Sequence, residues 1–407
     1  MKIFKRIIFA VLVILITKTV ANSQNTWTQK TNFPGNPRAY PFGFSIGNRG
    51  YLGGGYSFSD PNKHTYNDFW EFNPDSNVWH RKSFAPNLPI SSAVCFTIGN
   101  KGFITTGNPN SSLLWEFNPA LDAWKKKANF PGIGRTFAVA FSIGTKGYVG
   151  LGVGNTGPLN DFWEYDTIAD AWKQLANFPG NGRYAASAFS IGQKGYIGTG
   201  YDYTQTELTD FWEYNPATNK WTQKANVGTY GRGAGIGFNM SGFGYIGLGQ
   251  GKANPYLNDL WQYNPGSDQW TQMATCDSDL TSVWSVDFII GNKAYIGTGS
   301  SSGTLVAKYG NDFWEYDESS SGIDEKLNEE TFSIYPNPAK DNFTINASEL
   351  VKGYEITDIN GKIIYQETIL GYTKAINFNL LLANGLYFVR IISNNWIAIR
   401  KLLVCRE

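Results

Sequence analysis

Four arginines recur at one position of a repeated pattern, and they are the residues best suited to bind a ligand by charge. Each lies nine residues before a turn that ends an apolar segment, and the set is Arg38, Arg135, Arg183 and Arg232. A guanidinium group offers planar donors that fit a carboxylate, a sulfate or a phosphate. We expect the four to lie at one mouth of a central channel. Two interpretations stay open, because each arginine could equally hold the loops of its own blade by hydrogen-bonding carbonyls and the aspartate of a neighbouring "DFW" segment.

Aromatic side chains and one carboxylate are expected near the same mouth. The aromatic residues are Tyr40, Phe137, Tyr184 and Trp284. Aromatic faces beside charged groups hold sugars or extended peptides, but the same rings would also suit packing between repeats. Asp287 occupies a position that is small in the other repeats, so it either pairs with an arginine or lines the channel. The predicted ligand site therefore comprises the four arginines with Tyr40, Tyr184, Trp284 and Asp287.

The sequence offers little for metal binding or for nucleophilic catalysis. Its two histidines, His64 and His80, both fall in the first repeat, where we expect them to be separate surface residues. A Ser-His-Asp arrangement needs a histidine beside the nucleophile. Cys95 is expected to be a small residue of an inner strand. We therefore predict no catalytic residue, no metal and no cofactor.

The elements that must position these residues are short strands of a unit that recurs along the chain. One set of tryptophans recurs along the chain at intervals of 45 to 52 residues: Trp27, Trp79, Trp124, Trp172, Trp221 and Trp270. Between them stand glycine-rich segments such as "GYIGTG" and segments such as "DFWEY". A fixed period of this length indicates a repeat architecture, and each unit predicts four strands. The first strand carries a Phe with a small residue before it in most repeats, so we expect the bulky face of one sheet to pack on the small face of the next.

The first and last copies of the unit are incomplete, and each lacks what the other has. "NTWTQK" has no "DFWEY" segment before it, and "NDFWEYD" has no tryptophan strand after it. If the segment around Trp27 adds the outer strand to the sheet that ends at Tyr316, six sheets form a ring without an open seam. We therefore predict an all-β fold with a six-bladed β-propeller over residues 24–317, closed by its N-terminal strand.

The six copies resemble kelch repeats, as in the galactose-oxidase-like β-propellers. The resemblance covers residues 25–317, although only Gly54-Gly55 matches the diglycine of that family. Galactose-oxidase chemistry would require a copper site with two His, two Tyr and a nearby Cys, which the two histidines here do not suit. Some kelch propellers bind acidic ligands through arginines on the channel rim. Others are sialic-acid mutarotases, and the arginines with Asp287 could suit that reaction.

A second domain is predicted after the repeats. Residues 318–330 are polar and acidic, which is typical of a linker. Residues 331–407 contain alternating apolar strands broken by Asn-Pro and Asn-Gly turns, and they predict a small β-sandwich. The blocks "YPNPAKDNFTI", "DINGK", "GLYFVRI" and "RKLLV" resemble the type IX (Por) secretion system C-terminal sorting domain. The resemblance implies a Gram-negative bacterium, export across the outer membrane, and removal of this domain at the cell surface.

The N-terminal segment and the charge balance indicate where the protein is located and which classes of partner it can bind. "MKIFKRIIFAVLVILITKTVANSQ" has a basic start, a short apolar run and a small-residue cleavage signal, so residues 1–23 predict a cleaved signal peptide and no stable transmembrane anchor. The 34 Lys and Arg against 33 Asp and Glu form no basic block, so we expect no nucleic-acid partner. Three cysteines do not make a disulfide framework.

These patterns favour a secreted or cell-surface propeller that binds a glycan or a protein without catalysis. Its expected partners are that ligand and the type IX secretion machinery, which would recognise the C-terminal domain. Two alternatives stay open. One is a carbohydrate-active enzyme such as a sialic-acid mutarotase, and the other is a structural protein of the surface layer.

Overall fold

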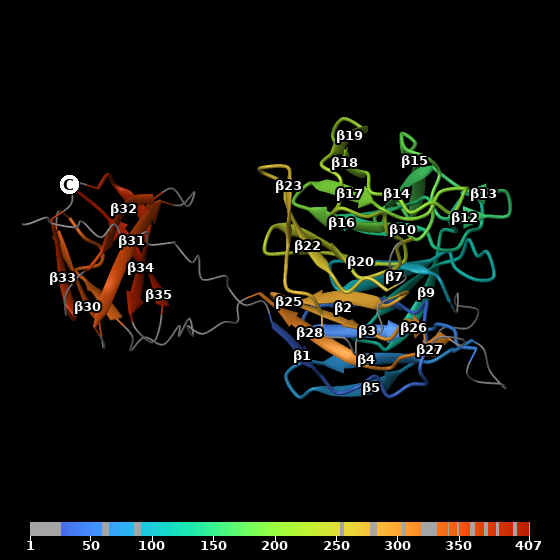
Figure 1. Ribbon diagram of the computed structural model, residues 1–407, viewed down its shortest axis with the longest axis horizontal. Coiled ribbons are helices and arrows are strands. Elements are labelled where there is room, and N and C mark those ends of the chain that lie inside the picture. Colours follow the sequence, from blue (N-terminus) through green and yellow to red (C-terminus); the bar gives the residue numbers. More distant parts are fainter. Residues whose placement is uncertain are drawn as a thin grey trace, which may run out of the picture. The chain divides into compact units, whose positions relative to one another are not determined.

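The repeated sequence unit folds into a four-stranded antiparallel sheet in the computed structural model (Figure 1). The structure describes residues 26–58, 65–84, 91–252, 256–276, 283–302, 307–318, 332–340, 342–347, 350–358, 363–369, 373–379, 382–393 and 397–406. The predicted signal peptide, most of the predicted linker and His64 lie outside these residues. The described residues up to Glu318 belong to one compact unit and those from Phe332 onward to another.

Six sheets, here called blades 1 to 6, make up the described part of residues 26–318. Blade 1 is β2 (Phe42–Ile46), β3 (Arg49–Gly53), β4 (Phe69–Asn73) and β5 (Val78–Lys82). Blade 2 is β6 (Val94–Ile98), β7 (Lys101–Thr105), β8 (Leu114–Asn118) and β9 (Ala123–Lys127). Blade 3 is β10 (Val139–Ile143), β11 (Lys146–Gly150), β14 (Phe162–Asp166) and β15 (Ala171–Gln174).

The other three blades repeat the same order from the inner to the outer strand. Blade 4 is β16 (Ser187–Ile191), β17 (Lys194–Gly198), β18 (Phe211–Asn215) and β19 (Lys220–Lys224). Blade 5 is β20 (Ile236–Met240), β21 (Phe243–Gly247), β22 (Leu260–Asn264) and β23 (Gln269–Gln272). Blade 6 is β24 (Val286–Ile290), β25 (Lys293–Gly297), β28 (Phe313–Asp317) and β1 (Thr26–Gln29). Two short hairpins, β12 (Val153–Gly154) with β13 (Gly157–Pro158) and β26 (Ser300–Ser302) with β27 (Ala307–Tyr309), lie in loops.

The blades form a closed ring. Each first strand contacts the first strand of the next blade in the cycle β2, β6, β10, β16, β20, β24 and back to β2. The two ends of the propeller meet in blade 6, where Trp27 pairs with Tyr316 and their ring centroids are 4.9 Å apart. Phe33, which follows β1, is fully buried. The predicted closure by the N-terminal strand is therefore confirmed.

Neighbouring blades pack through one large residue and one small residue, which is a glycine in five blades and Ala294 in blade 6. The first-strand Phe of each blade lies over the second strand of the next, and a Cβ added to Gly102 would lie 2.2 Å from the ring of Phe44. The same contact recurs at Gly50, Gly147, Gly195 and Gly244. The receiving glycine lies on the face that carries the small first-strand residues, since Gly50 pairs with Ser45, two residues after Gly43. The bulky face of one sheet therefore packs on the small face of the next, as expected. The small first-strand residues also line the channel.

The C-terminal unit is a small β-sandwich, as predicted. One sheet holds β29 (Phe332–Tyr335), β30 (Asn342–Ala347) and β33 (Ala375–Asn379). The other holds β32 (Ile363–Thr368), β31 (Val351–Asp358), β34 (Gly385–Ser393) and β35 (Ile397–Val404). Alternate apolar side chains of the two sheets form a single core that includes Ile345, Ile356, Val389 and Leu402.

Candidate functional site

The connecting loops of all six blades gather at one end of the sheets. Because the strands are antiparallel, the loop before the first strand and the loop before the third strand open at the same end. Isolated bridges join the two loops in every blade, for example Ala39 with Tyr56 and Tyr184 with Tyr201. We call this end the loop face; its described residues are 30–41, 54–58, 65–68, 83–84, 91–93, 106–113, 128–138, 151–161, 175–186, 199–210, 225–235, 248–252, 256–259, 273–276, 283–285, 298–302 and 307–312.

Each predicted arginine binds an aspartate of its own blade across the loop face. In blade 4, Arg183 Nη1 and Nη2 donate to Asp210 Oδ1 and Oδ2 over 2.6 and 2.7 Å. The same guanidinium group donates to the backbone oxygens of Thr199 and Asn181. Trp212 Nε1 also donates to Asp210. The equivalent pairs in blades 1, 3 and 5 are Arg38–Asp68, Arg135–Asp161 and Arg232–Asp259.

Burial and charge act in opposite directions on the paired aspartates. Burial alone would raise the pKa of Asp210, but the hydrogen bonds and the positive charge of Arg183 outweigh it and hold that pKa below its usual range. The side chain of Arg183 is 1% exposed, and the other three arginines are as deeply buried. The predicted role of these arginines as ligand-binding groups at the channel mouth therefore needs correction. Their geometry matches the structural alternative, and we leave them out of the candidate site.

A ring of backbone hydrogen bonds surrounds the channel at its mouth. Six residues, one from each blade, donate their N–H to the carbonyl of the equivalent residue in the preceding blade over 3.0 to 3.1 Å. All six have a positive φ, between 53° and 59°. A non-glycine residue pays about 1 kcal/mol for this conformation, which the continuous ring offsets. The members are Tyr40, Ser92, Phe137, Ala185, Ala234 and Trp284.

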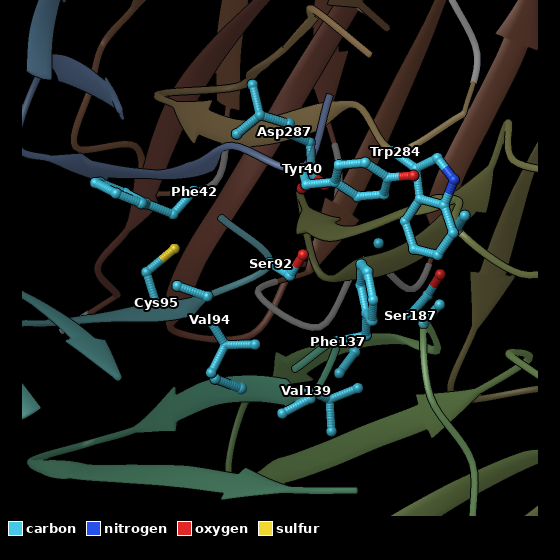
Figure 2. Close-up of a pocket in the computed structure, with 18 of the residues that line it drawn as sticks. Tyr40, Phe42, Ser92, Val94, Cys95, Phe137, Val139, Ser187, Trp284 and Asp287 are labelled. Atoms are coloured by element: carbon cyan, nitrogen blue, oxygen red, sulfur yellow. The ribbon is translucent and has the colours of Figure 1, made fainter. Parts of the chain in front are cut away.

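Three aromatic members of this ring meet over a cavity in the channel (Figure 2). The ring centroids of Tyr40 and Trp284 lie 4.9 Å apart, those of Phe137 and Trp284 4.8 Å, and those of Tyr40 and Phe137 5.5 Å. The cavity beside them measures about 270 Å³. The ring of Tyr184 is tilted against Tyr201 and lies 6.3 Å from that of Phe137 between centroids, but Tyr184 is not among the described residues that line this cavity. Of the predicted aromatic residues, Tyr40 and Trp284 are thus brought together with Phe137.

Asp287 lies deeper in the channel, where no arginine is found among the described residues that line the cavities around it. It lines this cavity and also a second one of about 250 Å³, so it stands between the two. Burial raises the pKa of Asp287 to about 7, although the backbone of Gly237 opposes the shift with a hydrogen bond. Cys95 lines the first cavity and donates to the carbonyl of Gly43 over 2.8 Å. Burial, helped by the charge of Asp287, raises the pKa of the Cys95 thiol to about 12.

The loop face also exposes large apolar side chains that the sequence analysis did not select. Tyr203 is 80% exposed and Tyr230 59%, and Phe58 and Ile133 are exposed as well. Tyr203 and Phe58 lie in loops before third strands, whereas Tyr230 and Ile133 lie in loops before first strands. For Ile133 and Tyr230 the available signal was an adjacent glycine in a loop. His80, by contrast, lies in β5 opposite Glu71, and the described residues contain no group of side chains that could hold a metal ion.

Comparisons with known proteins agree with this description of the two units. Residues 333–405 match the family model Por_Secre_tail, described as "Secretion system C-terminal sorting domain". Such a domain indicates export by the type IX secretion system to the cell surface. No curated protein matches the chain. In the part of the chain that the structure describes, no helix has the length and hydrophobicity to cross a membrane.

Solved structures resemble the propeller in fold. One of them, titled "Structure of YjhT", is a propeller that matches with a TM-score of 0.54 and 19% sequence identity. The match covers 61% of this chain and 88% of that chain. At this level of identity the similarity supports the propeller fold and carries no information about the ligand.

Proposed function

We propose that this chain, whose residues 333–405 form a secretion-system sorting domain, is a kelch-type propeller that binds a glycan or a protein at the surface of a Gram-negative bacterium. In this proposal residues 1–23 are a cleaved signal peptide, residues 24–317 the propeller, residues 318–330 a linker and residues 331–407 the sorting domain. The propeller acts as a binding module without catalysis. The mature N-terminus would be Gln24, which N-terminal sequencing of the exported protein can test.

The proposal rests on one observation about the loop face: ion pairs hold its loops, and the same loops expose large apolar side chains. Buried Arg–Asp pairs hold the loops of four blades, so these loops lose little further freedom when a ligand binds. Tyr203 and Tyr230 project from these held loops into solvent. Exposed tyrosines stack on sugar rings and are also enriched where proteins bind one another.

Catalysis is left out because the arginines that would bind an acidic substrate are engaged elsewhere. A reaction on an acidic sugar would draw on the four arginines and on Asp287. The arginines are already paired with aspartates, and no arginine is among the residues that line the two cavities around Asp287. The four arginines that a sialic-acid mutarotase would use to bind its acidic substrate are therefore not available for that role.

The test uses the full-length protein on arrays of immobilised glycans and of cell-surface proteins. Removing an aromatic hot-spot side chain typically costs more than 1 kcal/mol, so Tyr203→Ser combined with Tyr230→Ser should weaken binding at least about tenfold. The matched control is Ile168→Ser, because Ile168 is 85% exposed in a turn at the opposite end of blade 3. Equal loss in the control, or no specific binding on either array, would contradict the proposal.

A further inference from the structure

A single carboxylate lies in a channel that is otherwise lined by neutral residues. Asp287 projects from the innermost strand of blade 6, and the equivalent residues of the other blades are Gly43, Cys95, Ala140, Ala188 and Gly237. All six line the cavity of about 270 Å³, and Figure 2 labels Cys95 and Asp287 among them. Asp287 is therefore the one departure from small, uncharged side chains at this level of the channel.

No cation of the described protein neutralises this carboxylate. The residues that line the two cavities around Asp287 include no Lys, Arg or His. An ionised carboxylate in such surroundings is costly unless a positive charge accompanies it. A cationic ligand that entered the cavity would supply the missing charge.

The aromatic rings at the mouth favour an organic cation over a metal ion. Tyr40, Phe137 and Trp284 line the same cavity as Asp287. Aromatic faces carry negative potential and attract ammonium groups, most strongly where water is excluded. A metal ion would instead need several oxygen, nitrogen or sulfur ligands, and the described residues offer no such group. A cavity of about 270 Å³ suits a small ligand and not an oligosaccharide.

We propose that the channel cavity binds a small organic cation of the alkylammonium class, with Asp287 as its counter-ion and Tyr40, Phe137 and Trp284 as its aromatic wall. This site is separate from the exposed tyrosines of the loop face. The proposal does not rest on glycan or protein binding there, and either can fail without the other.

Titration calorimetry of the full-length protein with choline tests the proposal. Its uncharged carbon analogue 3,3-dimethylbutan-1-ol has nearly the same shape, so the comparison isolates the charge. We expect saturable choline binding and at least tenfold weaker binding of the analogue. Equal binding of both compounds, or no binding of choline, would overturn the proposal, and neither result depends on a variant that has to fold.

Two variants and a pH series complete the experiment. Asp287→Asn should weaken choline binding at least tenfold, whereas Asp202→Asn, which removes a loop-face carboxylate outside both cavities, should not change it. An unaffected Asp287→Asn protein would overturn the proposal.

Choline binding to the wild type should be about tenfold weaker at pH 6 than at pH 8, because the carboxylate with a pKa of about 7 is ionised only in the upper part of that range. The other titratable groups that line the two cavities are Tyr40 and Cys95. Burial raises the pKa of each to about 12, so neither changes charge between pH 6 and pH 8. Affinity that is constant across this range would contradict the role of Asp287.

Discussion

Replacing Arg183 with methionine should destabilise the propeller by about 3 kcal/mol. Methionine preserves much of the apolar stem but removes both hydrogen bonds to Asp210 and those to two backbone carbonyls. Removing one partner of a buried ion pair costs about 3 to 5 kcal/mol, because the remaining charge is left without compensation. The side chain of Asp210 is 23% exposed and retains some water, so the lower end of this range applies.

The assay is urea unfolding of the full-length wild type, Arg183→Met, Asp210→Asn and the double variant. Removing both charges should restore at least about 1 kcal/mol relative to Arg183→Met, because no unpaired carboxylate remains. Lys194→Met is the matched control, since the Lys194–Glu213 pair is partly exposed and such a pair contributes about 1 kcal/mol or less. If Arg183→Met costs no more than Lys194→Met, the Arg–Asp pairs do not hold the loop face.

The unfolding free energies of the same variants should also depend on pH in the acid range. The pKa of Asp210 is lower in the folded protein than in the unfolded chain, so the unfolded chain takes up a proton first as the pH falls. The contribution of the pair is complete above the unfolded pKa of about 4 and is lost as the pH falls through the lower folded value. The difference in unfolding free energy between wild type and double variant should therefore shrink below about pH 4. A difference that is constant from pH 7 to pH 2 would refute this assignment.

Three further changes test other parts of the structure. Glu318→Ala should lower the unfolding free energy by about 1 to 3 kcal/mol in urea titrations, because Glu318 accepts hydrogen bonds from Tyr245 and Gln262. Gln262 occupies the position at which most other blades have a glutamate. Gly195→Ala should cost about 1 to 3 kcal/mol, because the new Cβ would lie 2.1 Å from the ring of Phe141. Asp287→Asn should raise the unfolding free energy by roughly 4 kcal/mol at pH 8 but little at pH 4, because the raised pKa makes ionisation costly only in the folded protein. Unchanged stability in the first two variants, or a gain in the third that does not depend on pH, would contradict these contacts.

Much of the fold follows from residues that the sequence repeats. The tryptophan period and the two incomplete copies predicted a ring in which the segment around Trp27 forms the strand next to Tyr316. The structure confirms this pairing. The packing of the bulky face of one blade on the small face of the next was also predicted. A strand period of two tells which side chains share a face, but it did not show that each first-strand Phe would lie over the second strand of the next blade. Small residues of the second strands receive the rings because they leave room for them, a glycine in five blades and Ala294 in blade 6.

The candidate site was less predictable, because position along the chain does not fix where a side chain points. The spacing placed the arginines in the loops before first strands, but each guanidinium group turns toward an aspartate of its own blade. One signal was present in the sequence: the second repeat lacks both partners, with Ile90 and Leu113 at the two positions. The positive φ at Tyr40 and its equivalents could not be predicted from the sequence, because none of the six is a residue type that favours this conformation.

Hydrogen exchange of the backbone amides of Thr26–Gln29 tests the closed ring most directly. If β1 is the outer strand of blade 6, its paired amides should be protected to a similar degree as those in the outer strands of the other blades. Replacing Trp27 with alanine should then speed exchange in β1 and in Phe313–Asp317 together. Exchange of Thr26–Gln29 at the rate of an unstructured peptide, with β28 still protected, would show that the ring closes without its N-terminal strand.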